Sequence, residues 1–178
     1  MKHVMIDLET MGITPQAPIV SIGAVLFDPN LSKLGRSSLG ETFYAELDWE
    51  WQDRSPCDST IEWWSTQSQE ARDALGGEDD LKEVLVGLAS WIPSNAKVWG
   101  NGSTFDISML EDAYRQHGLE IPWKFWNIRD CRTVVDMFET QRGGFGQNRK
   151  AASHNALEDA IAQAKYIMRM WRKLVFSK

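Results

Sequence analysis

KHVMIDLET, residues 2–10, combines an apolar run typical of a buried strand with two carboxylic acids near its end. In a strand, alternate side chains point to the same face, so Asp7 and Glu9 are expected to project together. Two carboxylates on one face of a central strand repel each other and are costly to desolvate. A bound Mg²⁺ or Mn²⁺ would relieve that repulsion, because both ions prefer oxygen ligands. The alternative is a solvated strand end beside a turn, and the Asp-x-Glu pattern alone does not separate the two.

The apolar segments that follow this strand predict one mixed sheet with helices on its faces. Two more β-rich runs come soon after it and are close enough in sequence to form a meander with it. Helical patterns then alternate with two short strands. The class expected is therefore α/β, with one central mixed five-stranded sheet flanked by helices, in a single domain over residues 1–178. Strands are expected at residues 2–8, 18–28, 42–47, 96–100 and 126–131, and helices at 59–75, 79–92, 105–117, 132–140 and 155–175.

A second acid stands in WGNGSTFD, residues 99–106. The segment has the pattern of a strand end, a glycine-rich turn and a helix that begins near Asp106. Ser103 or Thr104 is a candidate N-cap for that helix. Read alone, Asp106 has a purely structural explanation, because an acid in the first turn complements the helix dipole.

A third acid and a histidine stand in HNALEDA, residues 154–160. His154 lies between a glycine-rich basic loop, residues 141–153, and the last helix, while Asp159 falls in the first turns of that helix. Asn155 and Glu158 have the spacing of a capping pair, which gives Glu158 a structural role and leaves His154 and Asp159 without one. With an unperturbed pKa near 6.5, a histidine at this position suits proton transfer. The alternative is an exposed loop histidine.

The order of these motifs resembles the DEDD superfamily of 3′–5′ exonucleases, in the subgroup with a histidine in the third motif (DEDDh). The resemblance covers nearly the whole chain and rests on IDLET, FDISML and HNALEDA. WGNGSTFD and TIEWWSTQSQEAR (residues 60–72) are further similar to the small RNase-T-like and exodeoxyribonuclease VIII-like enzymes of bacteria and phages. One departure concerns the second motif: many members carry HNxxFD, and Asn101 here stands one residue farther from Phe105.

This resemblance implies a ribonuclease-H-like fold and a metal-dependent exonuclease. Two Mg²⁺ ions, with Mn²⁺ as a substitute, would lie about 3.5–4 Å apart and would be held by Asp7, Glu9, Asp106 and Asp159. His154 would act as general base. The expected substrate is the 3′ end of a single-stranded nucleic acid, RNA or DNA, and the product is a nucleoside 5′-monophosphate.

Contacts with the substrate are expected at three places. By resemblance, the turn Thr10-Met11-Gly12 meets the terminal nucleotide. Trp63 and Trp64 diverge by about 100° on a helix, so one of them, Trp64, is assigned to the substrate and the other to the core or a subunit contact. Arg149 belongs to the basic loop, which is interpreted either as a segment that orders over the substrate phosphates or as a solvated surface loop.

Composition narrows the function classes. The net charge of −6 argues against sequence-independent coating of a duplex, although a carboxylate metal site adds negative charge that bound cations reverse. The N-terminus has no signal-peptide pattern, there is no membrane-spanning apolar run, and the two cysteines lack metal spacing, so a cytoplasmic protein is expected. RNase-T-like relatives suggest a homodimer. Two alternatives remain: a catalytically inactive nucleic-acid-binding module and a polymerase-associated proofreading subunit.

Overall fold

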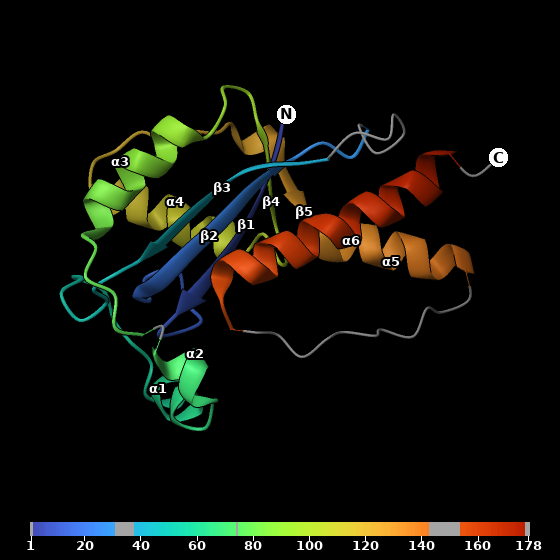
Figure 1. Ribbon diagram of the computed structural model, residues 1–178. Helices are drawn as coiled ribbons and strands as arrows, with labels where there is room; N and C mark the ends of the chain where they lie inside the picture. The colour runs from blue at the N-terminus through green and yellow to red at the C-terminus, as the bar shows by residue number, and fades with distance from the viewer. Residues whose placement is uncertain (1, 31–37, 74, 143–153, 177–178) are drawn as a thin grey trace.

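One mixed sheet organises the molecule (Figure 1). The computed structural model describes residues 2–30, 38–73, 75–142 and 154–176, with the backbone alone at 139–142 and 172–176. Within these residues the strand order is β3-β2-β1-β4-β5, and β1 pairs antiparallel with β2 and parallel with β4. The predicted meander and mixed sheet are confirmed. The strands are β1 His3–Thr10, β2 Ile19–Phe27, β3 Leu39–Glu46, β4 Lys97–Gly100 and β5 Ile128–Asp130.

Helices cover both faces of the sheet (Figure 1). The long C-terminal helix α6 crosses β1 and β2 with α5 beside it, and α3 and α4 lie on the other face. Among the described helices, none combines the length and apolarity needed to cross a membrane. The helices are α1 Asp58–Ser65, α2 Gln69–Asp73, α3 Leu81–Trp91, α4 Asp106–Gln116, α5 Cys131–Arg142 and α6 Ala156–Phe176, and a 3₁₀ turn, η2 Phe125–Asn127, precedes β5.

The alternation of side chains along β1 divides the core into two layers. Val4, Ile6 and Leu8 pack into the cluster shared with α3 and α4. Met5 lies on the opposite face, in the cluster that includes Ala160 of α6. The residues that follow Met5 at every second position therefore face α6 as well.

The helix expected over residues 59–75 is two helices, α1 and α2. The Thr66 hydroxyl donates to the carbonyl of Trp63 at 2.6 Å, and the Gln67 side-chain amide donates to the same carbonyl at 3.0 Å. Ser68 then accepts the backbone N–H of Ala71 at 3.2 Å and so caps the start of α2. Short polar side chains that bond the local backbone compete with helix continuation, which explains the break.

Candidate active site

Strand β1 carries Asp7 and Glu9 on the face of the sheet that α6 covers. They follow Met5 at alternate positions, and the buried Leu8 between them points into the opposite layer. Glu9 is 9% exposed, near the end of an otherwise buried strand. The shared projection predicted from the sequence is confirmed.

Helix α6 brings Asp159 to these two acids. Oxygen atoms of Asp7, Glu9 and Asp159 all lie within 4.8 Å of one another. The Gln163 side chain, one turn after Asp159, donates a 2.7 Å hydrogen bond to Asp7 Oδ1. Helix α6 therefore supplies both a third carboxylate and a donor that orients the first.

Close approach of α6 to the sheet depends on Gly23. This residue pairs with Asp7 across β1 and β2. A Cβ atom at Gly23 would lie 2.1 Å from the carbonyl carbon of Ala156 and 2.2 Å from the backbone nitrogen of Leu157. Any side chain there would collide with the backbone of the first turn of α6, so glycine is what lets Asp159 reach β1.

Asp106 is the first residue of α4, and only 3% of it is exposed. The expected cap by Ser103 or Thr104 is wrong: Phe105 occupies the N-cap position and makes no side-chain cap bond. The backbone N–H of Ser103 donates instead to Asp130 Oδ2 at 2.6 Å, which ties the glycine-rich turn to β5. A Cβ at Gly100 would lie 3.0 Å from Asp106 Oδ2, so the turn packs directly against this carboxylate.

Burial and mutual repulsion raise the pKa of the clustered acids. Burial raises the pKa of Glu9 to about 8, with further contributions from Asp159 and Asp106. Burial also raises the pKa of Asp106 to about 7, against backbone hydrogen bonds that lower it. The pKa of Asp7 lies well above its usual range because of burial, then of Asp106. A buried, crowded set of oxygen donors fits a hard divalent cation, which would stabilise the ionised forms.

His154 lies two residues before α6, the helix that carries Asp159, and packs on two tryptophans. Its ring meets the ring of Trp63 edge-on at 5.0 Å and that of Trp64 at 6.0 Å. Its φ of 52° is in the left-handed region, just before Asn155, whose side chain accepts the backbone N–H of Glu158 at 3.1 Å. Asn155 therefore caps α6 as expected. Within the described residues, the group of acids that lie within 4.8 Å of one another does not include this histidine.

The two tryptophans divide their roles differently from the expectation. Trp64 is only 3% exposed, and its indole N–H donates to the carbonyl of Thr10 at 3.0 Å. This buried side chain therefore helps to fix the turn that begins at the end of β1. Trp63 is 42% exposed and faces His154. Contact of Trp64 with a substrate stays a prediction, and Trp63 is the tryptophan with an open face.

The turn at residues 10–12 is buried and held by the backbone. The Thr10 hydroxyl donates to the carbonyl of Gly12 at 2.7 Å. Met11 is 2% exposed and packs with Val20 and Trp64. Its carbonyl accepts the backbone N–H of Cys57 at 2.7 Å. The structure therefore makes this turn a rigid feature next to Glu9, and its contact with a terminal nucleotide stays a prediction.

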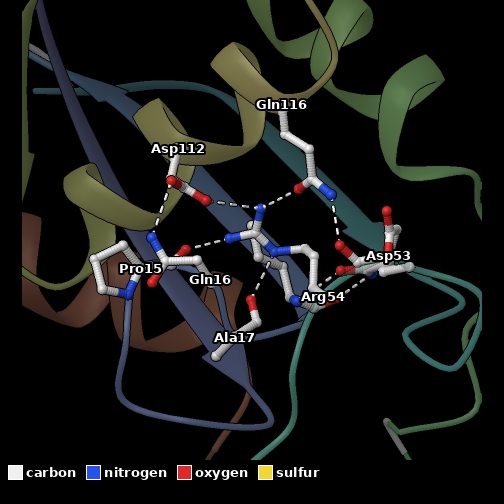
Figure 2. A network of polar contacts seen from close by, with 9 residues as sticks. Pro15, Gln16, Ala17, Asp53, Arg54, Asp112 and Gln116 are labelled. Atoms are coloured by element: carbon white, nitrogen blue, oxygen red, sulfur yellow. Dashed lines mark hydrogen bonds and ion pairs between the residues drawn. The ribbon is translucent and has the colours of Figure 1, made fainter.

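A buried arginine fixes the loop after that turn (Figure 2). Arg54 Nε donates to the carbonyl of Ala17 at 2.8 Å, and Nη2 donates to the carbonyl of Pro15. Nη1 donates to Gln116 at 2.8 Å and lies 3.3 Å from Asp112 Oδ2, both on α4. These contacts join the loop to α4, which begins at Asp106.

Comparison with known proteins identifies the family. The 3′–5′ exoribonuclease Rv2179c-like domain matches residues 2–171. The chain belongs to this family. It is a 3′–5′ exonuclease with the ribonuclease-H-like fold of the DEDDh nucleases, as the resemblance predicted. An exodeoxyribonuclease of Enterobacteria phage T4 is 29% identical to this chain in an alignment that covers 74% of this chain and 70% of that protein.

Solved structures of other nucleases have the same fold as this chain at low sequence identity. Cell-death related nuclease 4 superposes with a TM-score of 0.66 at 10% identity, over 94% of this chain and 62% of that one. The chain thus spans less than two thirds of that nuclease. The nuclease domain of 3′hExo, a DEDDh member bound to rAMP, superposes with a TM-score of 0.59 at 17% identity, over 96% of this chain and 91% of that one.

Several residues of the site were not found from the sequence. Gln163 follows Asp159 by four residues, so helical spacing would have placed both on one face. Gly23, Trp63 and Arg54 act through contacts distant in sequence, and no local pattern marks them. Arg149 lies outside the described residues, as does most of the basic loop expected at residues 141–153.

Proposed function

We propose that this domain removes nucleotides from the 3′ end of single-stranded RNA or DNA and releases nucleoside 5′-monophosphates. The observation that carries the proposal is the meeting of Asp7, Glu9 and Asp159 within 4.8 Å. The charge of buried Asp106 raises the pKa of Asp7 and of Glu9. The family is described as exoribonuclease, and the phage T4 relative as exodeoxyribonuclease. Among the solved neighbours, 3′hExo holds rAMP and Exonuclease X holds duplex DNA with a 5′ overhang.

Asp7, Glu9, Asp106 and Asp159 are proposed to hold two Mg²⁺ ions, with Mn²⁺ as a substitute. Support comes from the oxygen-only donor set and from the solved Pop2p of S. pombe in its Mg²⁺- and Mn²⁺-bound form. When bound, such cations stabilise the negative charge that develops on the phosphate. Gln163 keeps one oxygen of Asp7 fixed through its hydrogen bond.

His154 is proposed to accept the proton of the attacking water. The water oxygen bonds to the terminal phosphorus, the bond from phosphorus to the 3′ oxygen of the preceding nucleotide breaks, and that oxygen takes a proton from solvent. General-base catalysis contributes about 10²–10⁴-fold, so His154→Ala should retain a measurable residual rate, unlike the loss of a carboxylate. The edge-on contact with Trp63 would help to hold the imidazole ring in one orientation.

Thr10, Met11, Gly12, Trp64 and Arg149 complete the proposal as substrate-binding residues. The turn at residues 10–12 is held beside Glu9 by the hydrogen bonds of Thr10 and Trp64, so its backbone would meet the terminal nucleotide in a defined position. A homodimer is carried over from the resemblance, and sedimentation analysis of the purified protein tests it directly.

The experiment is a time course on 5′-labelled single-stranded RNA and DNA of the same sequence, resolved on a denaturing gel. Wild type with Mg²⁺ should produce a ladder that shortens from the 3′ end, and a chelator should abolish it. Asp159→Asn should be inactive. Glu158→Gln is the matched control, because Glu158 is an exposed acid in the same helical turn and should retain activity. Intact strands with wild type in both Mg²⁺ and Mn²⁺ would contradict the proposal and favour a binding module.

A further inference from the structure

Arg132 lies at the edge of the sheet where the carboxyl ends of the parallel strands meet. It is the second residue of α5 and follows Asp130, the last residue of β5. Asp130 pairs with Gly100, the last residue of β4, next to the turn that leads to Asp106. Because β1, β4 and β5 run parallel, their ends meet at the same edge of the sheet as the acids.

The guanidinium of Arg132 lies flat on the glycine-rich turn. Gly102 has a φ of +110°, and a Cβ there would lie 3.2 Å from Cζ, 3.4 Å from Nη2 and 3.5 Å from Nε of Arg132. Such similar distances to three atoms of one plane mean that the face of the guanidinium covers Gly102 and its N–H edge points away. Gly100, two residues earlier, packs against Asp106 Oδ2. One turn therefore positions both the cation and the carboxylate.

The guanidinium N–H groups of Arg132 have no acceptor within the described residues, and the side chain is exposed. Its nearest acid in sequence, Asp130, already accepts the backbone N–H of Ser103 at 2.6 Å and of Thr133 at 3.1 Å. The nearby Arg129 differs in this respect. Arg129 donates to the carbonyls of Trp126 and Ile128 at 2.8 Å.

Arg132 and Asp106 lie on the same turn. The guanidinium covers Gly102, and the carboxylate packs against Gly100. Burial raises the pKa of Asp106, and the charge of Arg132 is among the causes that lower it. A positive group here matters in a chain with a net charge of −6, because the substrate strand is also negative.

We propose that Arg132 binds a backbone phosphate on the 5′ side of the scissile bond and so holds the substrate strand as it leaves the carboxylate cluster. The inference rests on the proposed exonuclease function. A guanidinium held flat by one face presents two parallel N–H groups along its edge, which matches a pair of phosphate oxygens. Its place beside the cluster suits a phosphate that is bound but not cleaved.

The test compares two substrates in Mg²⁺. The first is a single strand of about 10 nucleotides, long enough to cover one binding groove. The second is the p-nitrophenyl ester of thymidine 5′-monophosphate, which has a single phosphodiester. Arg132→Gln should raise KM for the strand about 10-fold, as expected for a lost charge-assisted contact, and leave kcat/KM for the ester unchanged. Arg132→Lys keeps the charge without the paired N–H groups and should fall between.

Arg115→Gln is the matched control. Arg115 pairs with Glu111 on α4, nine residues and about 14 Å along the helix from Asp106, and its loss should change neither substrate. The salt dependence of strand binding should also become shallower by about 0.7 in log–log slope for Arg132→Gln, as for one lost phosphate contact.

Equal losses on both substrates, or an unchanged KM for the strand, would overturn the role of Arg132. If wild type hydrolyses neither substrate, the exonuclease proposal fails, but the role of Arg132 is still testable. Fluorescence anisotropy then measures the affinity of wild type and Arg132→Gln for the labelled strand in chelator. Affinity of Arg132→Gln about 10-fold weaker than wild type would support the phosphate contact, and equal affinity would contradict it. If Arg132→Gln does not fold, the same comparisons are made with Arg132→Lys.

Discussion

At the scale of single residues, the carboxylates of the site oppose the stability of the fold. Asp7 and Glu9 are ionisable groups in a buried strand. Burial and the charges of neighbouring acids raise the pKa of both. A buried apolar residue at either position would stabilise the metal-free protein. Their presence therefore indicates a function that needs negative charge at a buried site shielded from solvent.

Asp7→Asn should separate activity from stability. Asparagine keeps an oxygen that can accept the Gln163 hydrogen bond and removes the repulsion with Glu9 and Asp106. We expect the metal-free variant to gain about 1–2 kcal/mol, which raises Tm by about 2–8 °C, while exonuclease activity is lost. Thermal unfolding in chelator checks this, with Asp136→Asn on the exposed side of α5 as control. A lower Tm for Asp7→Asn would contradict this view of the cluster.

The metal-free protein should lose stability as the pH rises. Glu9 and Asp106 have folded pKa values of about 8 and about 7, above their ordinary 4.5 and 3.8. Between its unfolded and folded pKa values, each group holds its proton in the folded chain and has lost it in the unfolded one. The contribution of Glu9 and Asp106 to the free energy of unfolding is therefore complete below about pH 4, falls as the pH rises and is lost once the pH has passed 7 to 8. Buried His3 acts in the opposite direction between about pH 4 and pH 6.5, because its pKa is lowered from 6.5 to about 4 and only the unfolded chain binds its proton there. Above about pH 6.5 both states are neutral at His3, so the loss of stability comes from the acids.

Melting curves in chelator from about pH 6 to about pH 9 measure this loss. Added Mg²⁺ should raise Tm more at the alkaline end, where the unbound acids are ionised and repel one another. A flat Tm profile in chelator, or a Mg²⁺ effect that is larger at acid pH, would contradict the assigned repulsion.

The residue-scale predictions from sequence succeeded where one element carries the signal. Asp7 and Glu9 share a strand, and strand alternation alone places them on one face. Asp106 and Asp159 came from the resemblance, because no local rule brings α4 and α6 to the end of β1. The exposed Trp63 and the buried Trp64 could not be told apart, since neighbouring tryptophans have the same local pattern.

At the scale of elements, the site depends on how closely α6 approaches the sheet. Gly23 of β2 sits under the first turn of α6, opposite Asp7 on β1. Gln163 and Asp159, four residues apart on α6, then meet Asp7 together. The geometry of the acids is therefore set by the contact between a strand and a helix.

Gly23→Ala should displace α6 and reduce activity. The new methyl group would lie about 2 Å from backbone atoms of Ala156 and Leu157, so the helix must move. We expect a loss of about 1–3 kcal/mol from overpacking and a fall in kcat of more than about 10²-fold, since small shifts of catalytic groups are costly. Gly87→Ala on α3 is the matched control, because its methyl group meets nothing closer than 3.8 Å and should stabilise the helix. Equal behaviour of the two variants would show that the approach of α6 does not set the site.

The order and type of the strands and helices were predictable from the sequence, but the ends of individual helices were less so. All five strands and the order of the helices follow from apolar periodicity. The break between α1 and α2 was missed, because the side chains of Thr66 and Ser68 fit a helix surface as well as a helix end. The N-cap of α4 was misassigned because the backbone of Ser103 is held by Asp130, a partner that is 27 residues away.

At the scale of the whole molecule, the fold gathers acids that are far apart in sequence. Asp7 and Asp159 are separated by nearly the full chain, and Asp106 comes from the opposite layer of helices. Arg54 adds to this assembly by joining the loop after β1 to α4 (Figure 2). The mixed sheet, with β1 at its centre, is what makes one edge common to all three acidic segments.

The central claim is that these segments form one divalent-cation site. Titration of Mn²⁺ into the metal-free protein, followed by electron paramagnetic resonance of the free ion, tests it most directly. Wild type and Glu158→Gln should bind Mn²⁺ equally, and Asp159→Asn should bind it at least about 10-fold more weakly, as for a lost carboxylate ligand. Equal binding by all three proteins would contradict the claim, because Asp159 would then contribute nothing to the site.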